Sequence, residues 1–158
     1  MMKLIRHSLV AVALLGAQAL LLSAPAAAAG NACKLEITGN DQMQYDKKEL
    51  AVPASCKEVT VTIHHAGQLP AAAMGHNWVL VATPDLTAVA NAGMGAGLAN
   101  NYVTTGDKRV IANTKVVGGG QTASVTFSTS GLKPGGDYSY LCTFPGHNAL
   151  MRGKFKFG

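Results

Sequence analysis

Three side chains with soft or borderline metal-binding atoms lie within ten residues of one another near the end of the chain. They are Cys142, His147 and Met151, and the Pro-Gly pair between the first two predicts a turn that folds them together. A thiolate, an imidazole and a thioether favour copper over harder ions. The set is incomplete, because a trigonal copper site needs a second imidazole. Any fold of this chain must therefore bring a distant histidine to this segment.

His76 is the best candidate for that second imidazole. It precedes the apolar run 79–81, so we expect it at the edge of a strand, on the same rim of a small β domain as Cys142. The adjacent pair His64 and His65 is a weaker candidate, because neighbouring residues of a strand face opposite sides. We expect His64 to be exposed and His65 to be packed or hydrogen-bonded just below the metal end.

The N-terminus has the pattern of a secretory signal peptide. Lys3 and Arg6 precede an apolar stretch over residues 9–22, and small residues follow it up to Ala29. The apolar stretch is shorter than the roughly 18 to 20 residues that cross a bilayer as a helix. We therefore expect cleavage after Ala29, export to the periplasm, no membrane insertion after cleavage, and one domain over residues 30–158.

The expected mature chain carries a mild positive charge. Without Lys3 and Arg6, eleven basic and eight acidic side chains remain, a net charge of about +3. The basic residues are scattered along the sequence and form no stripe with interleaved aromatic residues. This distribution argues against nucleic acid as a partner and leaves a weak preference for acidic protein surfaces.

Three cysteines in an exported chain leave one without a disulfide partner. Cys33 and Cys56 are the natural pair, and they would close a loop of about 23 residues that contributes roughly 3 kcal/mol by the chain-entropy model. Their spacing alone leaves open a disulfide between either of them and Cys142. Such a pairing would destroy the candidate metal site.

Alternating apolar and polar residues predict a β-sandwich. The clearest strand is 58–65, in which every second residue faces the core. Further strands are expected at residues 34–38, 50–52, 77–83, 109–112, 122–128, 137–142 and 153–157. A short helix is expected after Pro84, because apolar residues recur at helical spacing from Leu86 to Met94. The pattern thus predicts an all-β fold of two antiparallel sheets, about eight strands in all, with one short helix.

These motifs, in this order, resemble the azurin family of blue-copper cupredoxins. The shared stretches are Met74 to Leu80 and Cys142 to His147 with Met151, together with Cys33, Gly39 to Gln44, Cys56 and Gly131 to Lys133. The resemblance covers essentially all of the chain after the first thirty residues. It implies a cupredoxin-like Greek-key β-sandwich or barrel with a helical flap. It also implies a disulfide between Cys33 and Cys56 at the end away from the metal.

Ligand chemistry and the resemblance together assign the ligands of one type 1 copper ion. Cys142, His76 and His147 are expected in the equatorial plane, with Met151 as a long axial ligand. The resemblance adds the backbone carbonyl of Gly75 as a distant contact on the other side of the metal. It also implies hydrogen bonds to the Cys142 sulfur from the backbone N–H groups of Asn77 and Phe144, and a side chain of Asn77 that ties the two ligand loops together.

The resemblance further implies an apolar docking patch around the edge of His147. Its expected members are Met43, Leu69, Ala73, Met74, Met94, Phe144, Pro145, Ala149 and Leu150. The partners that the resemblance suggests are transient redox proteins, namely c-type cytochromes, nitrite reductase or amine dehydrogenases. We expect the chain itself to be a monomer.

These features predict a periplasmic electron carrier that cycles copper between Cu(I) and Cu(II) and is not an enzyme. A copper oxidase or nitrite reductase domain is disfavoured, because Leu141 and Thr143 rather than histidines flank Cys142. The alternative is a copper-binding or storage module without redox turnover, although the expected mature chain has only four methionines and no Cys-x-x-Cys motif. Zinc in the same pocket would leave a structural domain without redox function.

Overall fold

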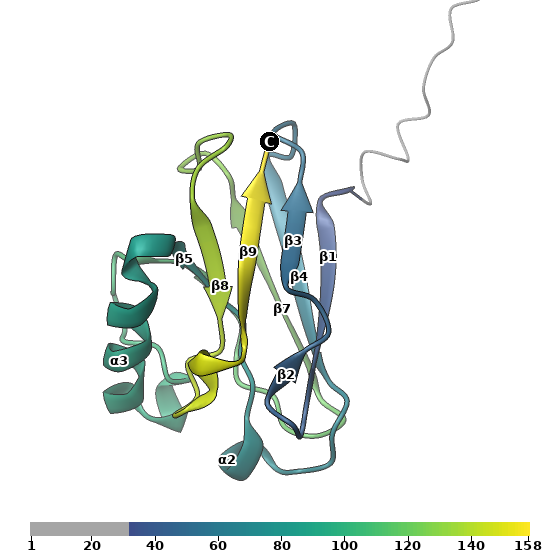
Figure 1. The fold of residues 1–158 in the computed structure, drawn as a ribbon, viewed down its shortest axis with the longest axis vertical. Coiled ribbons are helices and arrows are strands. Elements are labelled where there is room, and N and C mark those ends of the chain that lie inside the picture. The colour runs from purple at the N-terminus through teal and green to yellow at the C-terminus, as the bar shows by residue number, and fades with distance from the viewer. Residues whose placement is uncertain (1–31) are drawn as a thin grey trace, which may run out of the picture.

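The computed structural model describes residues 32–158, and its strands form two sheets packed face to face (Figure 1). The expected signal peptide and the expected mature start at residue 30 lie outside the described residues. The first sheet has the order β2-β1-β4-β7, with β1 (Lys34–Asn40), β2 (Gln44–Tyr45), β4 (Glu58–His65) and β7 (Thr122–Ser128). The second has the order β3-β9-β8-β5-β6, with β3 (Glu49–Val52), β5 (Val79–Ala82), β6 (Val110–Asn113), β8 (Tyr138–Leu141) and β9 (Arg152–Phe157).

The predicted two-sheet sandwich is confirmed, with two differences in detail. A ninth strand, the two-residue β2, lies beside the end of β1. Two pairs are parallel, β1 with β4 and β3 with β9, whereas the prediction had both sheets antiparallel. Alternation of apolar residues shows which face of a strand is buried, but it does not show the direction of the neighbouring strand.

The core lies between the inner faces of the two sheets. From the first sheet, Ile37, Val61 and Ile63 are fully buried. Trp78, directly before β5 of the second sheet, is also fully buried, and its ring stacks against Phe127 of the first sheet with centroids 6.1 Å apart. Trp78 therefore fills the core, as its alternation with Leu80 predicts.

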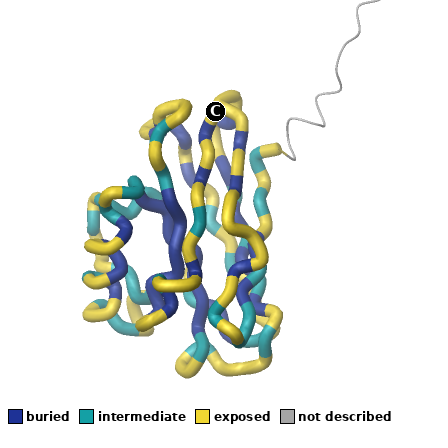
Figure 2. The backbone as a smooth tube through the Cα atoms, viewed as in Figure 1, coloured by how far each residue is buried: buried dark blue, intermediate teal, exposed yellow. Residues whose placement is uncertain are grey.

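The outer face of β5 and β8 is covered by α3 (Leu86–Ala96), which stands beside the sandwich in Figure 1. Its buried side chains pack on β5 and β8, and Figure 2 shows the helix buried on its inner side and exposed on its outer side. Because β5 is buried on both faces, its sequence is apolar without alternation. The helix confirms the predicted flap and ends at Gly97, where φ is 73°. The other helical turns are α2 (Ala71–Met74), η1 (Thr83–Asp85), η2 (Leu98–Asn100) and η3 (His147–Ala149).

The disulfide lies at one end of the sandwich, and several loops gather at the other end. Cys33 and Cys56 form a disulfide just before β1 and β4 begin, which confirms the expected pairing. The turn after β1, the segment after α2 and the loop between β8 and β9 gather at the opposite end. Within residues 32–158, no helix is both long and apolar enough to cross a membrane.

Candidate metal centre

Three ligand residues from distant parts of the chain converge at this second end. Cys142 directly follows β8, His147 begins η3, and His76 follows α2. All three are buried, and one donor atom from each lies within 4.8 Å of the others. The Cys142 Sγ is 3.8 Å from the His147 Nδ1. The fold therefore brings the sequence-predicted thiolate and both imidazoles to one point.

The ring of His76 is oriented by a backbone carbonyl outside the site. Its Nε2 lies 2.8 Å from the carbonyl oxygen of Asn40, so Nε2 carries the proton and donates it. The Nδ1 is then a lone-pair donor, and it is buried without any hydrogen-bond partner. A buried polar atom of this kind costs free energy unless it is satisfied, and a metal ion satisfies it. The geometry thus fits a cation beside His76.

Burial also keeps the two imidazoles neutral. Desolvation, with smaller contributions from the nearby imidazoles of His76 and His65, lowers the pKa of His147 to about 4. Desolvation likewise lowers the pKa of His76. Metals bind the neutral ring, so neither histidine has to lose a proton before it binds metal at neutral pH.

Cys142 is the third donor, and two effects on its thiol oppose each other. Complete burial raises its pKa to about 11, whereas backbone hydrogen bonds from Asn77 and Phe144 favour the thiolate. The carbonyl oxygen of Gly75 lies 3.9 Å from the sulfur. Burial wins in the absence of a cation, so the thiol keeps its proton until a metal displaces it.

Met151 is fully buried beside the same pocket. Its backbone closes the ligand loop, because Met151 N donates to His147 O at 2.8 Å and Cys142 N donates to Met151 O at 2.9 Å. A side chain on Gly39 would occupy the same space: its Cβ would lie 3.3 Å from the Met151 Cε and 2.7 Å from the His76 Cδ2. The side chains of Met151 and His76 therefore both pack against Gly39, in the place that a side chain at residue 39 would take.

The side chain of Asn77 joins the two ligand loops. Its Oδ1 accepts from the backbone N of Thr143 at 2.9 Å, and its Nδ2 donates to Thr143 Oγ1 at 2.7 Å. The same Nδ2 donates to the carbonyl oxygen of Asn101 at 2.7 Å. Sequence reasoning did not identify Asn101. Its backbone is left-handed, with φ of 56°, and this turn has no signal in the sequence.

Comparisons with known proteins show the family of this chain. The family model described as copper binding proteins, plastocyanin/azurin family, matches residues 31–158. The chain belongs to the plastocyanin/azurin family. It is 56% identical over 124 residues to Azurin-1 of Alcaligenes xylosoxydans xylosoxydans, covering 78% of this chain and 96% of that protein.

Two further members of the plastocyanin/azurin family give the same result. Azurin of Bordetella pertussis is 50% identical over 142 residues, covering 90% of this chain and 95% of that protein. The solved structure of azurin Az-iso2 from Methylomonas sp. strain J superposes with a TM-score of 0.77 at 47% identity, covering 80% of this chain and 98% of that one. The cupredoxin fold and the family predicted from the sequence are thereby confirmed.

A ring of aromatic and imidazole side chains surrounds the donors of this plastocyanin/azurin domain. Phe144 packs against His147 with centroids 4.5 Å apart and meets Tyr102 edge to face at 5.0 Å. On the other side, His65 stacks on His76 at 4.3 Å. Sequence reasoning did not identify Tyr102, because a single aromatic residue in a loop carries no periodic signal.

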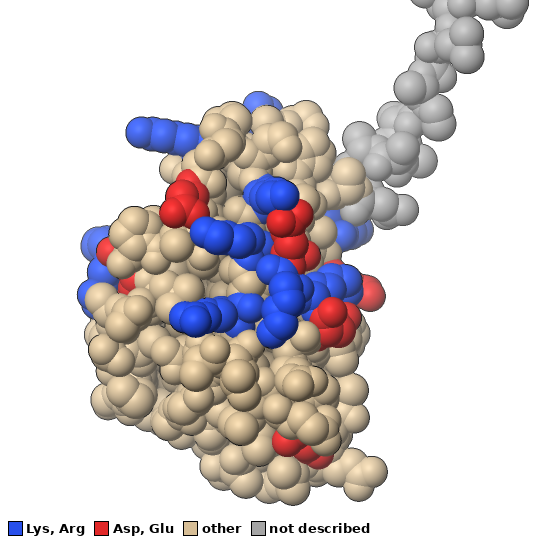
Figure 3. Space-filling view, viewed as in Figure 1, with Lys and Arg blue, Asp and Glu red and all other residues tan. Residues whose placement is uncertain are grey.

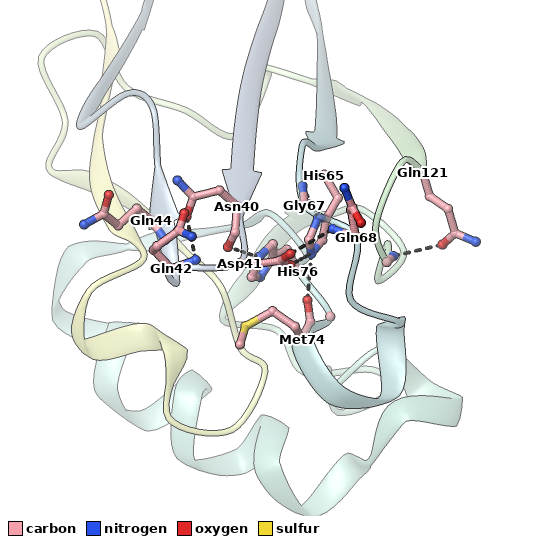
Figure 4. A network of polar contacts seen from close by, with 12 residues as sticks. Asn40, Asp41, Gln42, Gln44, His65, Gly67, Gln68, Met74, His76 and Gln121 are labelled. Carbon is pink, nitrogen blue, oxygen red and sulfur yellow. Dashed lines mark hydrogen bonds and ion pairs between the residues drawn. The ribbon is translucent and has the colours of Figure 1, made fainter.

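A polar network holds His65 in place (Figure 4). The backbone N of Gly67 donates to His65 Nδ1 at 3.0 Å, so the proton lies on Nε2, which donates to the carbonyl of Met74 at 2.8 Å. His65 is 2% exposed, so it is both packed and hydrogen-bonded, which confirms the prediction. The stacked rings of His65 and His76 are thus both held in orientation by hydrogen bonds to backbone groups.

The residues of the expected docking patch differ in exposure. Leu69, Met94 and Leu150 are the most exposed large apolar members, at 42%, 50% and 52%. Ala73, Pro145 and Ala149 are exposed, Met43 and Met74 are half-buried, and Phe144 is buried. Leu98, which was not predicted, is 38% exposed. His147 itself is 3% exposed.

Proposed function

We propose that this chain carries single electrons between redox proteins through one copper ion in the pocket of Cys142, His76 and His147. The observation that carries the proposal is the buried Nδ1 of His76, which has no hydrogen-bond partner. A donor atom of His76 also lies within 4.8 Å of the donors of Cys142 and His147. Copper suits a thiolate with two imidazoles, and when bound it supplies reversible one-electron chemistry between Cu(I) and Cu(II).

The residues around the donors have complementary tasks. Cys142, His76 and His147 would hold the copper ion through a thiolate and two imidazoles, the thioether of Met151 would be a weaker ligand, and the carbonyl of Gly75 would be a distant contact. The backbone N–H groups of Asn77 and Phe144 take electron density from the sulfur and so tune the reduction potential. We assign these roles from ligand chemistry and family membership.

Rigidity of the donors favours electron transfer over catalysis. The hydrogen bonds that the Asn77 side chain donates to and accepts from Thr143, together with the backbone hydrogen bonds of Met151, hold both ligand loops in one arrangement. A site that rearranges little between two oxidation states exchanges electrons with a small barrier. The five proposed protein contacts also leave no open coordination position for a substrate. A catalytic metal site needs such an open position.

Electrons would leave through the end of the molecule where His147 lies under exposed apolar residues. Pro145, Ala149 and Leu150 flank the histidine in sequence and are exposed. With the other members named above they form the proposed docking patch, which suits short-lived contacts of small area. The proposed partners are c-type cytochromes, nitrite reductase or amine dehydrogenases.

The proposed location is the periplasm. The signal-like pattern of residues 1–29 supports export, with cleavage after Ala29 and a monomeric mature domain over residues 30–158. The disulfide between Cys33 and Cys56 agrees with an oxidising compartment.

The test is the visible and electron-spin-resonance spectrum of the mature protein after addition of Cu(II) and then ascorbate. We expect intense blue absorption with narrow copper hyperfine splitting, bleached reversibly by the reductant. Cys142→Ser should abolish the colour, whereas Met151→Leu should keep copper bound and raise the reduction potential. A colourless protein that holds copper tightly would contradict electron transfer and support storage. A lower potential in Met151→Leu would show that Met151 is not the axial ligand.

A further inference from the structure

Basic side chains gather on one face of the sandwich. Figure 3 shows them across the middle of the molecule, with acidic side chains above them and at their right-hand end, and an almost uncharged surface below. Three come from β9, where Arg152, Lys154 and Lys156 alternate outward and are exposed. Lys156 is paired with Glu49 at 2.9 Å, and Lys154 with Asp137 at 2.8 Å. The charge is therefore partly neutralised toward the far end of β9.

Toward the metal end, the charge is not neutralised. Within residues 32–158, no carboxylate lies at ion-pair distance from Arg152 or Lys48. The Nζ of Lys48 donates instead to the carbonyl oxygen of Leu150 at 2.9 Å. Lys48, Arg152 and Lys154 line one surface hollow of about 280 Å³, together with Thr83, Leu86, Ser139 and Gly153. We call this feature the cationic hollow.

The cationic hollow borders the proposed docking patch. Leu150, which Lys48 contacts, is 52% exposed and belongs to that patch. The backbone N of Leu150 donates to the carbonyl oxygen of His147 at 3.0 Å, so one residue separates the cations from a proposed copper ligand. A partner centred over the apolar patch would thus have one side of its rim over the cationic hollow.

We propose that the cationic hollow binds the carboxylate-rich rim of a redox protein whose electron-transfer centre faces the apolar patch. This inference rests on the proposed function and adds the orientation and the charge of the partner. Carboxylates are the groups that Arg binds in bidentate fashion and Lys binds as a point charge. The apolar patch has charge on only one side, so pairing with opposite charges on the partner fixes how the partner is rotated over the patch. Charge attraction also speeds the encounter.

A second copy of this chain does not fit the cationic hollow. A two-fold contact centred on the cationic hollow would bring Lys48 and Arg152 of one copy close to the same residues of the other copy. Like charges at such a contact are repulsive. The eleven basic and eight acidic side chains after residue 29 offer no acidic surplus elsewhere to compensate.

The first experiment is stopped-flow electron exchange between the copper-loaded protein and two c-type cytochromes, one with an acidic rim and one with a basic rim around the haem edge. Arg152→Glu removes one of the two cations of the hollow that have no ion pair in the described residues, and it leaves every proposed ligand unchanged. Lys57→Glu is the matched control, because Lys57 is an exposed lysine without an ion pair in the described residues and follows Cys56 at the opposite end. Both variants change the net charge equally.

With the acidic cytochrome at low salt, Arg152→Glu should lower the bimolecular rate constant by about 3- to 10-fold, while Lys57→Glu lowers it by less than about twofold. High salt should remove the difference, because exposed charges are screened. With the basic cytochrome, Arg152→Glu should not slow exchange. Equal effects of both variants would mean that only net charge matters and would overturn the proposal.

The second experiment locates the contact without electron transfer. The probe is a hexaglutamate peptide titrated into the ¹⁵N-labelled protein, with amide shifts recorded by nuclear magnetic resonance. Shifts confined to residues 48 and 152–154 that vanish in Arg152→Glu support the cationic hollow, and shifts spread over Lys57 and other lysines contradict it. If the wild-type protein exchanges electrons with neither cytochrome, the proposed function fails, and this titration still decides the binding surface.

Discussion

Gly39 shows that a missing side chain can shape a metal site as much as a ligand does. The His76 ring and the Met151 thioether occupy the place where a side chain of residue 39 would lie. Both are proposed ligands from different loops, and close packing fixes how they approach each other. The donor geometry thus depends on a residue that contributes no donor atom.

We expect Gly39→Ala to disturb the metal site more than the fold. Its Cβ would lie 2.7 Å from the His76 ring, which must tilt to accommodate it. The blue absorption band should shift or weaken, and copper should dissociate faster, as measured by visible spectroscopy with a chelator. Gly131→Ala is the control, because its Cβ has no neighbour within 4 Å. An unchanged spectrum in Gly39→Ala would show that the pocket relaxes freely.

At the scale of elements, α3 is attached to the site by a close backbone contact. Gly93 of α3 lies against the carbonyl of Tyr102, and Tyr102 packs edge to face on Phe144. Thr143 lies on the same side of Gly93, 3.2 Å from where a Cβ would be. The flap therefore supports the loop that carries Cys142, although none of its residues is a proposed ligand.

Gly93→Ala should destabilise the protein by about 1 to 3 kcal/mol through overpacking. The Cβ would collide with the carbonyl oxygen of Tyr102, a backbone atom that cannot move alone. Urea unfolding of the copper-free protein measures the change. Gly95→Ala in the same helix is the matched control, since its Cβ meets nothing within 4 Å and alanine favours the helix. Equal stabilities of the two variants would contradict the contact.

The turn before β6 has a pH-dependent ion pair. Arg109 binds Asp107 through Nε at 2.9 Å and through a terminal nitrogen at 2.7 Å, and these bonds lower the pKa of Asp107 to about 2. The unfolded value is about 3.9, so the ionised carboxylate favours the folded state. This stabilisation is complete above about pH 5 and is lost as the pH falls toward about 2.

Asp107→Asn should therefore be less stable than the wild type at neutral pH and equally stable near pH 2. Unfolding midpoints recorded across this range measure the difference. Glu58→Gln is the control, because Glu58 makes no ion pair in the described residues. A gap between wild type and Asp107→Asn that stays constant with pH would contradict the role of the ion pair.

On the scale of the whole molecule, the disulfide and the metal site lie at opposite ends of the same strands. β1 and β4 run in parallel from the disulfide, with Gly39 paired to His65 at the metal end. A cross-link over a separation of 23 residues limits the unfolded chain, whereas the ligand loops depend on local hydrogen bonds. Removal of the disulfide should thus lower the free energy of unfolding without changing the copper spectrum.

Replacing both Cys33 and Cys56 by Ala should lower the free energy of unfolding by about 3 kcal/mol. The blue spectrum of the folded, copper-loaded variant should match that of the wild type, because the substitutions are remote from every proposed ligand. Chemical unfolding and visible spectroscopy on the same samples check both parts. An altered copper spectrum would reveal coupling along β1 and β4.

Sequence alone determined the chemistry of this protein and most of its elements. A thiol, two imidazoles and a thioether are recognisable as residue types, and strand 58–65 appears with its predicted bounds because one face is apolar. The disulfide partner of Cys33 came from family resemblance, since spacing left Cys142 open as a rival. The amino-acid sequence thus shows which residue types can bind the metal and which segments have the periodicity of a strand or a helix.

Only the tertiary structure decided which distant residues meet. Several features join segments that lie far apart in the chain. They are the parallel strand pairs, the hydrogen bond from Asn77 to Asn101, the packing of His76 and Met151 against Gly39, and the hollow lined by Lys48 and Arg152. None has a periodic signal, because periodicity reports the face of an element and not its neighbour. Those contacts arise when the two sheets pack and the loops at one end close over a shared core.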